Sequence, residues 1–253
     1  MELRLAASRP RGAMIEAGKA PFGESGAQPM PDEKPVNYYQ NLRPEMLAFI
    51  PADSRRLLDV GCGEGYFAQQ LKQAENAEVW GIEVVEARAR VAADRLDKVL
   101  VGDVATLIPQ LPESFFDVVV FNDVLEHLLD PFDVLARIKT CLTPQGVVVS
   151  SIPNIRYYPT FYDLLAYCEW EYEESGILDS THLRFFTERS IRKMYERLGY
   201  EVLRQEGINK MEHMPRRYRL ANRLFHHRFW DMQFVEFATV ARPLQAADGS
   251  STR

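Results

Sequence analysis

Three glycines at alternate positions, with a carboxylate just before them, form the segment of this sequence most typical of a ligand-binding loop. The segment reads Leu-Asp-Val-Gly-Cys-Gly-Glu-Gly over residues 58–65. Glycines let a backbone turn sharply and approach a ligand where any side chain would collide. The spacing differs from the Gly-x-Gly-x-x-Gly pattern that seats a pyrophosphate on a helix N-terminus, so it favours a ligand with an ammonium group and no phosphate. The candidate contact residues are Asp59, Gly61, Cys62, Gly63 and Gly65.

Two further carboxylates follow at spacings that suit a nucleoside. Glu83 lies roughly 20 residues beyond the first glycine, where a carboxylate at a strand end can accept both hydroxyls of a ribose. Asp103, with Val104 beside it, follows the next apolar run, where a carboxylate can meet an adenine amino group. Each acid alone is equally well explained as a solvated strand end. The three acids in register with the glycine loop argue against three independent solvated strand ends.

These residues need a scaffold that brings strand ends together, and the apolar pattern predicts one. Runs of Val, Leu, Ile and Phe alternate with helical patterns, as in a doubly wound α/β sheet whose parallel strands are buried on both faces. The predicted strands are Arg56–Val60, Glu78–Ile82, Lys98–Val101, Phe116–Phe121, Gly146–Ser151, Tyr200–Arg204 and Gln233–Ala241. The predicted helices are Tyr66–Ala74, Val85–Asp94, Phe132–Leu142 and Glu188–Leu198. Such sheets bind ligands at the carboxyl ends of their strands.

The flanks and insertions differ in composition from this pattern. Proline and glycine without apolar periodicity predict a disordered N-terminal extension, within which Met30 is an alternative start of the natural chain. Aromatic residues concentrate in a segment that we interpret as a cap over the acceptor. The predicted segments are the extension (1–36), one folded domain (37–242) with its cap insertion (152–187) and a basic segment (204–230), and a polar tail (243–253).

The ordered motifs resemble the class I S-adenosylmethionine-dependent methyltransferases. The residues that carry the resemblance are 58–65, Gly-Ile-Glu at 81–83, Gly-Asp-Val at 102–104, Phe-Asp-Val-Val-Val-Phe-Asn-Asp-Val-Leu-Glu-His at 116–127 and Leu-Thr-Pro-Gln-Gly at 142–146. The resemblance implies a Rossmann-like seven-stranded sheet with helices on both faces and an antiparallel last strand. It also implies contacts to S-adenosylmethionine (SAM). These are Asp59 and the 61–65 loop to the methionine moiety, Glu83 to the ribose, Asp103 with Val104 to the adenine, and Asn122 beneath the cofactor near the methyl group.

A carboxylate–imidazole pair at the end of the fourth strand bears on the chemistry beyond the cofactor. Methyltransferases encoded with sugar-modifying enzymes carry similar signatures, Asn-Val-Leu-Glu-His and Thr-His-Leu-Arg-Phe-Phe-Thr, and use the histidine as a general base. By this resemblance we expect O-methylation of a sugar, nucleotide-sugar or glycan hydroxyl. His127 would be the base, Glu126 would orient it, and His182 would be a second polar contact from the cap. Glu126 and His127 are also compatible with a helix-capping carboxylate and a surface histidine, and His182 with a donor that orders a loop.

A metal-assisted route is an alternative, although we expect no metal. Ubiquinone-type and small-RNA O-methyltransferases use a Glu-x-x-Glu-His pattern as metal ligands. A metal here would use Asp123, Glu126, His127 and His182, and Asp123 replaces the longer first glutamate. Such an enzyme would act on a vicinal diol, a catechol or an RNA ribose. An alternative of another class is a cofactor-binding scaffold without turnover.

Charge and composition limit the partners. The 253-residue chain has a formal net charge of −6 and 46% hydrophobic residues, which argues against a general nucleic-acid binder. Between Arg204 and Arg228, however, seven Lys or Arg face two Glu. This basic segment suits an anionic acceptor, an anionic lipid surface or a simple solvated helix. The three cysteines match no disulfide framework and no apolar run would span a bilayer, so we expect a cytoplasmic protein with possible contact to the inner face of a membrane.

Overall fold

The computed structural model describes residues 42–245. The predicted extension at 1–36 and the last eight residues of the predicted tail lie outside this range. Seven strands form a single sheet in the order β3-β2-β1-β4-β5-β7-β6. The strands are β1 (Arg56–Val60), β2 (Glu78–Glu83), β3 (Lys98–Val101), β4 (Phe116–Asn122), β5 (Leu142–Pro153), β6 (Tyr200–Lys210) and β7 (Phe234–Pro243). Strands β1 to β5 pair in parallel and β7 runs antiparallel to both neighbours, as predicted.

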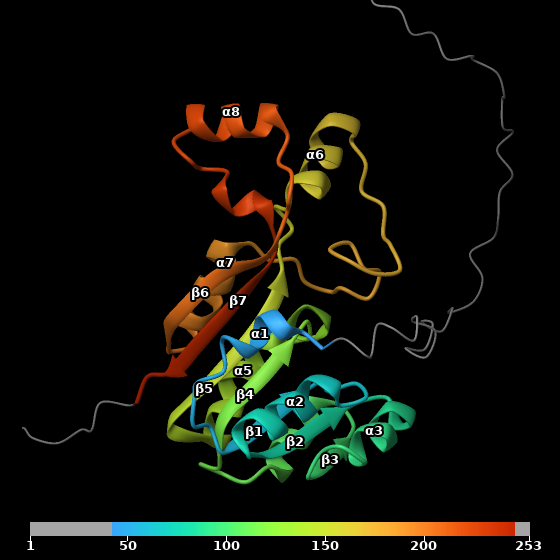
Figure 1. Cartoon of the computed structure of the whole chain (residues 1–253), viewed down its shortest axis with the longest axis vertical. Coiled ribbons are helices and arrows are strands. Elements are labelled where there is room, and N and C mark those ends of the chain that lie inside the picture. The colour runs from blue at the N-terminus through green and yellow to red at the C-terminus, as the bar shows by residue number, and fades with distance from the viewer. Residues whose placement is uncertain (1–41, 246–253) are drawn as a thin grey trace, which may run out of the picture. The chain divides into compact units, whose positions relative to one another are not determined.

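Helices connect the strands, and Figure 1 labels all of them except α4. They are α1 (Pro44–Leu47), α2 (Tyr66–Glu75), α3 (Glu86–Ala93), α4 (Val104–Leu107), α5 (Pro131–Ile138), α6 (Tyr158–Tyr167), α7 (Glu188–Arg197) and α8 (Arg216–Leu224). Helices α6 and α8 lie beyond one end of the sheet (Figure 1). Strand β6 ends at Lys210, which pairs with Phe234, and Pro153 at the end of β5 pairs with Glu236. The connection containing α8 therefore leaves the sheet at the carboxyl edge of the parallel strands.

Both faces of the sheet are buried, which explains the continuous apolar runs. Side chains alternate between the two faces along a strand. In β4, Val119 and Phe121 belong to one apolar cluster, and Val118 and Val120 belong to the other. All four are fully buried. The central strands thus pack between helices on both faces of the sheet, and this packing fixes the positions of their carboxyl ends.

The structure differs from the predicted elements at several boundaries and adds a helix. The helix expected over Phe132–Leu142 ends at Ile138, and β5 already begins at Leu142 because Leu142 pairs with Phe116. The register then shifts, and a Cβ on Gly146 would lie 2.8 Å from the Phe116 carbonyl oxygen, so this bulge requires glycine. Strand β6 extends to Lys210 rather than Arg204. The cap insertion contains a helix, α6, that we did not predict.

Candidate functional site

The glycine loop after β1 adopts a backbone that only glycine accommodates without strain. Gly61, Gly63 and Gly65 have φ angles of 72°, 55° and 80°. The Gly61 and Cys62 amides both donate to the carbonyl of Ile82, at 2.8 and 3.1 Å, which ties the loop to the end of β2. The loop is therefore fixed by backbone contacts, and its glycines are also required by close packing, since a Cβ on Gly61 would lie 2.6 Å from Val124 and one on Gly65 would lie 3.2 Å from Ala92.

Cys62 points away from this ligand space. A Cβ on Gly81 would lie 2.6 Å from the Cys62 sulfur, so the thiol fills the gap beside β2. Burial raises the pKa of this thiol above its ordinary value. Cys62 therefore stays neutral, and it can contact a cofactor only through its backbone.

The two acids next to the loop lie in different environments. Glu83, which is buried, accepts hydrogen bonds from the Gly63 amide at 2.8 Å and the Val85 amide at 2.9 Å, one on each oxygen. Asp59 is also buried, and burial together with the negative charge of Glu83 raises its pKa to about 8. Glu83 is thus positioned as an acceptor, whereas Asp59 needs a cation to become fully charged at neutral pH.

The other predicted cofactor residues follow β3 and β4. Asp103 caps α4, because its side chain accepts from the Ala105 amide at 2.7 Å, and Val104 is buried at the first position of that helix. Asn122 ends β4, whose Phe121 pairs with Val60 at the end of β1. Both amide atoms of the Asn122 side chain are buried and have no hydrogen-bond partner among the described residues. A buried amide without partners is costly, so this side chain is suited to a ligand.

Glu126, His127 and His182 form one cluster, although His182 comes from the cap. One ligand atom from each of them lies within 4.8 Å of the other two. The imidazole rings of His127 and His182 meet edge to face, 4.6 Å between centroids. Nε2 of His182 is 3.9 Å from Oε1 of Glu126. The structure thus brings together all three predicted catalytic residues.

Backbone carbonyls select the tautomer of each histidine. Nδ1 of His127 lies 3.2 Å from the Thr181 carbonyl oxygen, and Nδ1 of His182 lies 3.0 Å from that of Ile177. Because a carbonyl oxygen only accepts, each Nδ1 carries the proton and each lone pair is on Nε2. Histidines oriented in this way are suited to act as bases or as metal ligands.

Glu126 links the cluster to the cap. Its backbone carbonyl accepts from the amides of Leu183 and Arg184, at 2.9 and 3.1 Å. Its two carboxylate oxygens are buried and have no hydrogen-bond partner among residues 42–245. Burial, and then the charge of Asp123, raise the pKa of this carboxyl well above its usual range. A cation next to this carboxyl would favour its ionised form.

Comparison with known proteins identifies the family. A family model described as "Methyltransferase domain" matches residues 35–205. The chain belongs to this methyltransferase family. It is 28% identical over 152 residues to a ubiquinone biosynthesis O-methyltransferase of Pasteurella multocida, covering 53% of this chain and 61% of that protein. It is 26% identical over 136 residues to a malonyl-[acyl-carrier protein] O-methyltransferase of Halalkalibacterium halodurans, covering 50% and 48%.

The solved structures agree on the fold. A SAM-dependent methyltransferase from Archaeoglobus fulgidus superposes with a TM-score of 0.59 at 20% identity, over 81% of this chain and 92% of that one. The family model confirms the predicted methyltransferase family, and the superposition confirms the predicted fold. The chain spans about half the length of these curated relatives. Within residues 42–245 of the methyltransferase, no helix is both long and apolar enough to cross a membrane.

The residues at the carboxyl edge fit SAM. The buried Asp59 matches an ammonium group. Glu83 is held by two amides, and a carboxylate oxygen can accept further hydrogen bonds from ribose hydroxyls. The unpartnered amide of Asn122 supplies a donor and an acceptor nearby.

Sequence reasoning missed a buried arginine beneath the site. Arg43 precedes α1 and forms ion pairs with Asp123, with Glu236 of β7 and, at 2.9 Å, with Glu45. Asp123 also accepts from the Ser151 hydroxyl at 2.9 Å, so its carboxylate is engaged here rather than in the histidine cluster. Burial, with the charge of Asp123, raises the pKa of Glu236 to about 7. No local pattern marks Arg43, because its partners lie 80 and 193 residues away in the chain.

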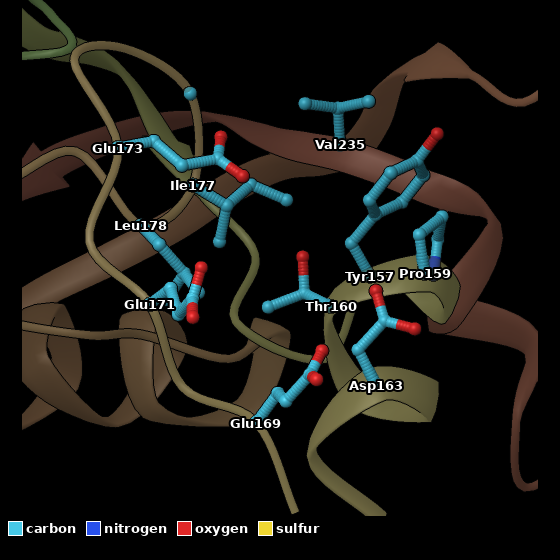
Figure 2. A pocket seen from close by; sticks show the side chains of 11 residues that line it. Tyr157, Pro159, Thr160, Asp163, Glu169, Glu171, Glu173, Ile177, Leu178 and Val235 are labelled. Atoms are coloured by element: carbon cyan, nitrogen blue, oxygen red, sulfur yellow. The ribbon is translucent and has the colours of Figure 1, made fainter. Parts of the chain in front are cut away.

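A pocket of about 390 Å³ adjoins the histidine cluster under α6. Figure 2 shows carboxylates on several sides of it, with apolar side chains between them. Its acidic residues are Asp163, Glu169, Glu171 and Glu173. Ile177 also lines the pocket, and its carbonyl oxygen accepts a hydrogen bond from Nδ1 of His182. Ile177 therefore contacts both the pocket and the cluster. Arg184, in the segment that follows His182, donates to the Leu129 carbonyl at 2.5 Å.

Proposed function

We propose that this protein is an O-methyltransferase that transfers the methyl group of SAM to a sugar or glycan hydroxyl. The observation that carries the proposal is the His127–His182–Glu126 cluster beside the cofactor edge, with the lone pair of His127 on Nε2. A hydroxyl becomes a good nucleophile when a base removes its proton. Two relatives named O-methyltransferases support oxygen as the acceptor atom.

The division of labour follows from the contacts. Bound SAM supplies an electrophilic methyl group on a sulfonium. The residues that would hold and orient SAM lie at the strand ends and in the glycine loop. They are Asp59, the glycine loop, Glu83, Asp103 with Val104, and Asn122. Nε2 of His127 would take the hydroxyl proton, while the Thr181 carbonyl keeps the ring in place through Nδ1. His182 and Glu126 would stabilise the positive charge that His127 then carries.

The acidic pocket supports a polyhydroxyl acceptor. Its volume of about 390 Å³ suits a small carbohydrate, and ionised carboxylates accept hydrogen bonds from hydroxyl groups. The same carboxylates repel a phosphate. We therefore place a neutral sugar or an amino sugar in this pocket, and any phosphate or lipid carrier outside it.

The test compares His127→Gln with His213→Gln, whose parent side chain is 95% exposed. We expect His127→Gln to lower kcat on sugar acceptors by about 100-fold or more, since general-base catalysis contributes about 10²–10⁴. SAM affinity, measured by calorimetry, should stay within about twofold, since His127 lies outside the glycine loop. The control variant, His213→Gln, should keep both the wild-type kcat and the wild-type SAM affinity. Equal losses of turnover and cofactor affinity would contradict the base assignment.

A metal-assisted route is the second candidate, and the two unpartnered oxygens of Glu126 favour it. Two imidazoles and a carboxylate suit a divalent transition metal, which would lower the pKa of a bound hydroxyl. Such an enzyme would act on a vicinal diol or catechol. Chelation should then abolish turnover, and Mn²⁺ or Zn²⁺ should restore it. If a chelator does not affect turnover, the metal-assisted route is excluded, and general-base catalysis by His127 is the mechanism that is left.

A further inference from the structure

The outer face of α8 exposes large apolar side chains next to arginines. Leu220 and Leu224 are 69% and 71% exposed, and Phe225, just after the helix, is 52% exposed. They lie in the connection between β6 and β7, which extends beyond the sheet (Figure 1). A cluster of exposed apolar side chains of this kind marks an interaction surface.

The inner face of α8 already holds the helix in place. Tyr218 and Asn222 are buried, one helical turn apart. The Tyr218 hydroxyl donates to the carbonyl of Phe229, and Asn222 accepts from the Phe229 amide at 3.0 Å. The Tyr218 ring also meets that of Tyr158 in α6, 5.3 Å between centroids. The leucines point the other way and contribute little to holding the helix.

The charge on this outer face is positive and uncompensated. Arg216, Arg219 and Arg223 are exposed, and none of them forms an ion pair with any other residue between 42 and 245. Arg217 differs, because it donates to the Tyr158 hydroxyl at 2.8 Å and so helps to join α8 to α6. Three arginines without counter-charges in a chain of net charge −6 call for an anionic partner.

We propose that the outer face of α8 docks the protein on an anionic lipid bilayer. The leucines need an apolar environment and the arginines an anionic one, and the headgroup region of such a bilayer supplies both over an open surface. A second copy of the chain would bring arginines against arginines. Nucleic acid would neutralise the arginines but leave the leucines in water. The lipid surface is the partner that satisfies both kinds of side chain.

The location of α8 gives this docking a consequence. The connection that carries α8 leaves the sheet beside Pro153, at the carboxyl edge where the glycine loop and the histidine cluster lie. Arg156, just beyond β5, pairs with Asp231 of the same connection at 2.9 Å. Docking through α8 would therefore hold the cofactor edge near the bilayer, within reach of an acceptor attached to a lipid.

The test is sedimentation of the full chain with vesicles of phosphatidylcholine alone or mixed with phosphatidylglycerol. We expect binding to the mixed vesicles only. Arg219→Gln combined with Arg223→Gln should weaken it about 25-fold, since each arginine near an anionic surface contributes about fivefold. Leu220→Gln combined with Leu224→Gln should weaken it about tenfold or more through lost apolar burial. Raising the salt from about 0.1 M to about 1 M should release the protein, because the screening length falls from about 10 Å to about 3 Å.

The matched control combines Arg90→Gln and Leu244→Gln, whose parent side chains are 75% and 61% exposed on other elements. It should bind like the wild type. Circular dichroism and SAM affinity should be the same in all four proteins, so a loss of vesicle binding cannot come from unfolding. Equal binding to both kinds of vesicle, no binding to either, or equal losses in the control would overturn the proposal. Binding of the wild type to RNA or to itself through these residues, without vesicle binding, would overturn it as well.

Discussion

Asp59→Asn should make the protein more stable and a poorer binder of SAM. Asp59 is buried beneath the glycine loop, and burial with the nearby charge of Glu83 raises its pKa to about 8 from an ordinary value of 3.8. The folded state therefore binds a proton that the unfolded state releases between these two pH values. The contribution of Asp59 to stability is greatest below pH 3.8 and falls as the pH rises to about 8.

The size of the effect follows from the two pKa values. The free energy of unfolding changes by at most about 1.4 kcal/mol per pH unit for one group. Between pH 5 and pH 8 the wild type should thus lose about 3–4 kcal/mol that Asp59→Asn, which cannot ionise, retains. The same change removes the carboxylate that would face the ammonium group of SAM. A hydrogen bond to a charged group contributes about 1.5–3 kcal/mol, so the affinity should fall by about 10- to 150-fold.

Denaturant unfolding of both proteins at several pH values measures the first effect, and calorimetric titration with SAM measures the second. The quantity to follow is the stability difference between variant and wild type, because contributions from all other groups cancel. A difference that does not change between pH 5 and pH 8 would refute the raised pKa. Unchanged SAM affinity in a correctly folded variant would refute the contact to the ammonium group.

Two further substitutions test the support of the site. Arg43→Met should destabilise the protein by about 3–5 kcal/mol at pH 8, because it leaves Asp123 and Glu236 without their shared cation. If denaturant unfolding shows that the free energy of unfolding falls by less than about 1 kcal/mol, the ion pairs contribute little. Gly61→Ala should cost about 2–4 kcal/mol and weaken SAM binding, since its φ is 72° and its Cβ would lie 2.6 Å from a methyl carbon of Val124. Wild-type thermal stability and SAM affinity in this variant would contradict a tightly built loop.

The cofactor half of the protein could be predicted from the sequence because its signals are local. The apolar run of β4 identified a strand buried on both faces, and the glycine spacing identified the loop that follows β1. The strand ends that carry Glu83 and Asn122 then follow from parallel pairing at one edge of the sheet. Glu126 and His127 are neighbours in sequence, so their presence at this edge required no knowledge of distant contacts.

The remainder depends on contacts between distant segments. Strand β6 continues past Arg204 because β7 supplies a partner as far as Lys210, which no pattern within β6 reveals. Helix α6 begins at a proline-containing turn among aromatic residues whose spacing shows no clear helical stripe. Arg43 has no local motif, since only the folded chain brings three carboxylates around it.

Glu126 shows how the cap insertion is connected to the carboxyl edge of the sheet. Its carbonyl holds the amides of Leu183 and Arg184, while its side chain faces His182. One residue shortly after β4 thus holds the cap and belongs to the cluster with His127 and His182. A change in the cap therefore reaches His127 through Thr181 and through Glu126 and His182, without passing through the glycine loop. Under the proposed function, the cap insertion sets acceptor choice separately from the SAM site. Two relatives of this chain are named for different substrates, one for ubiquinone biosynthesis and one for malonyl-[acyl-carrier protein].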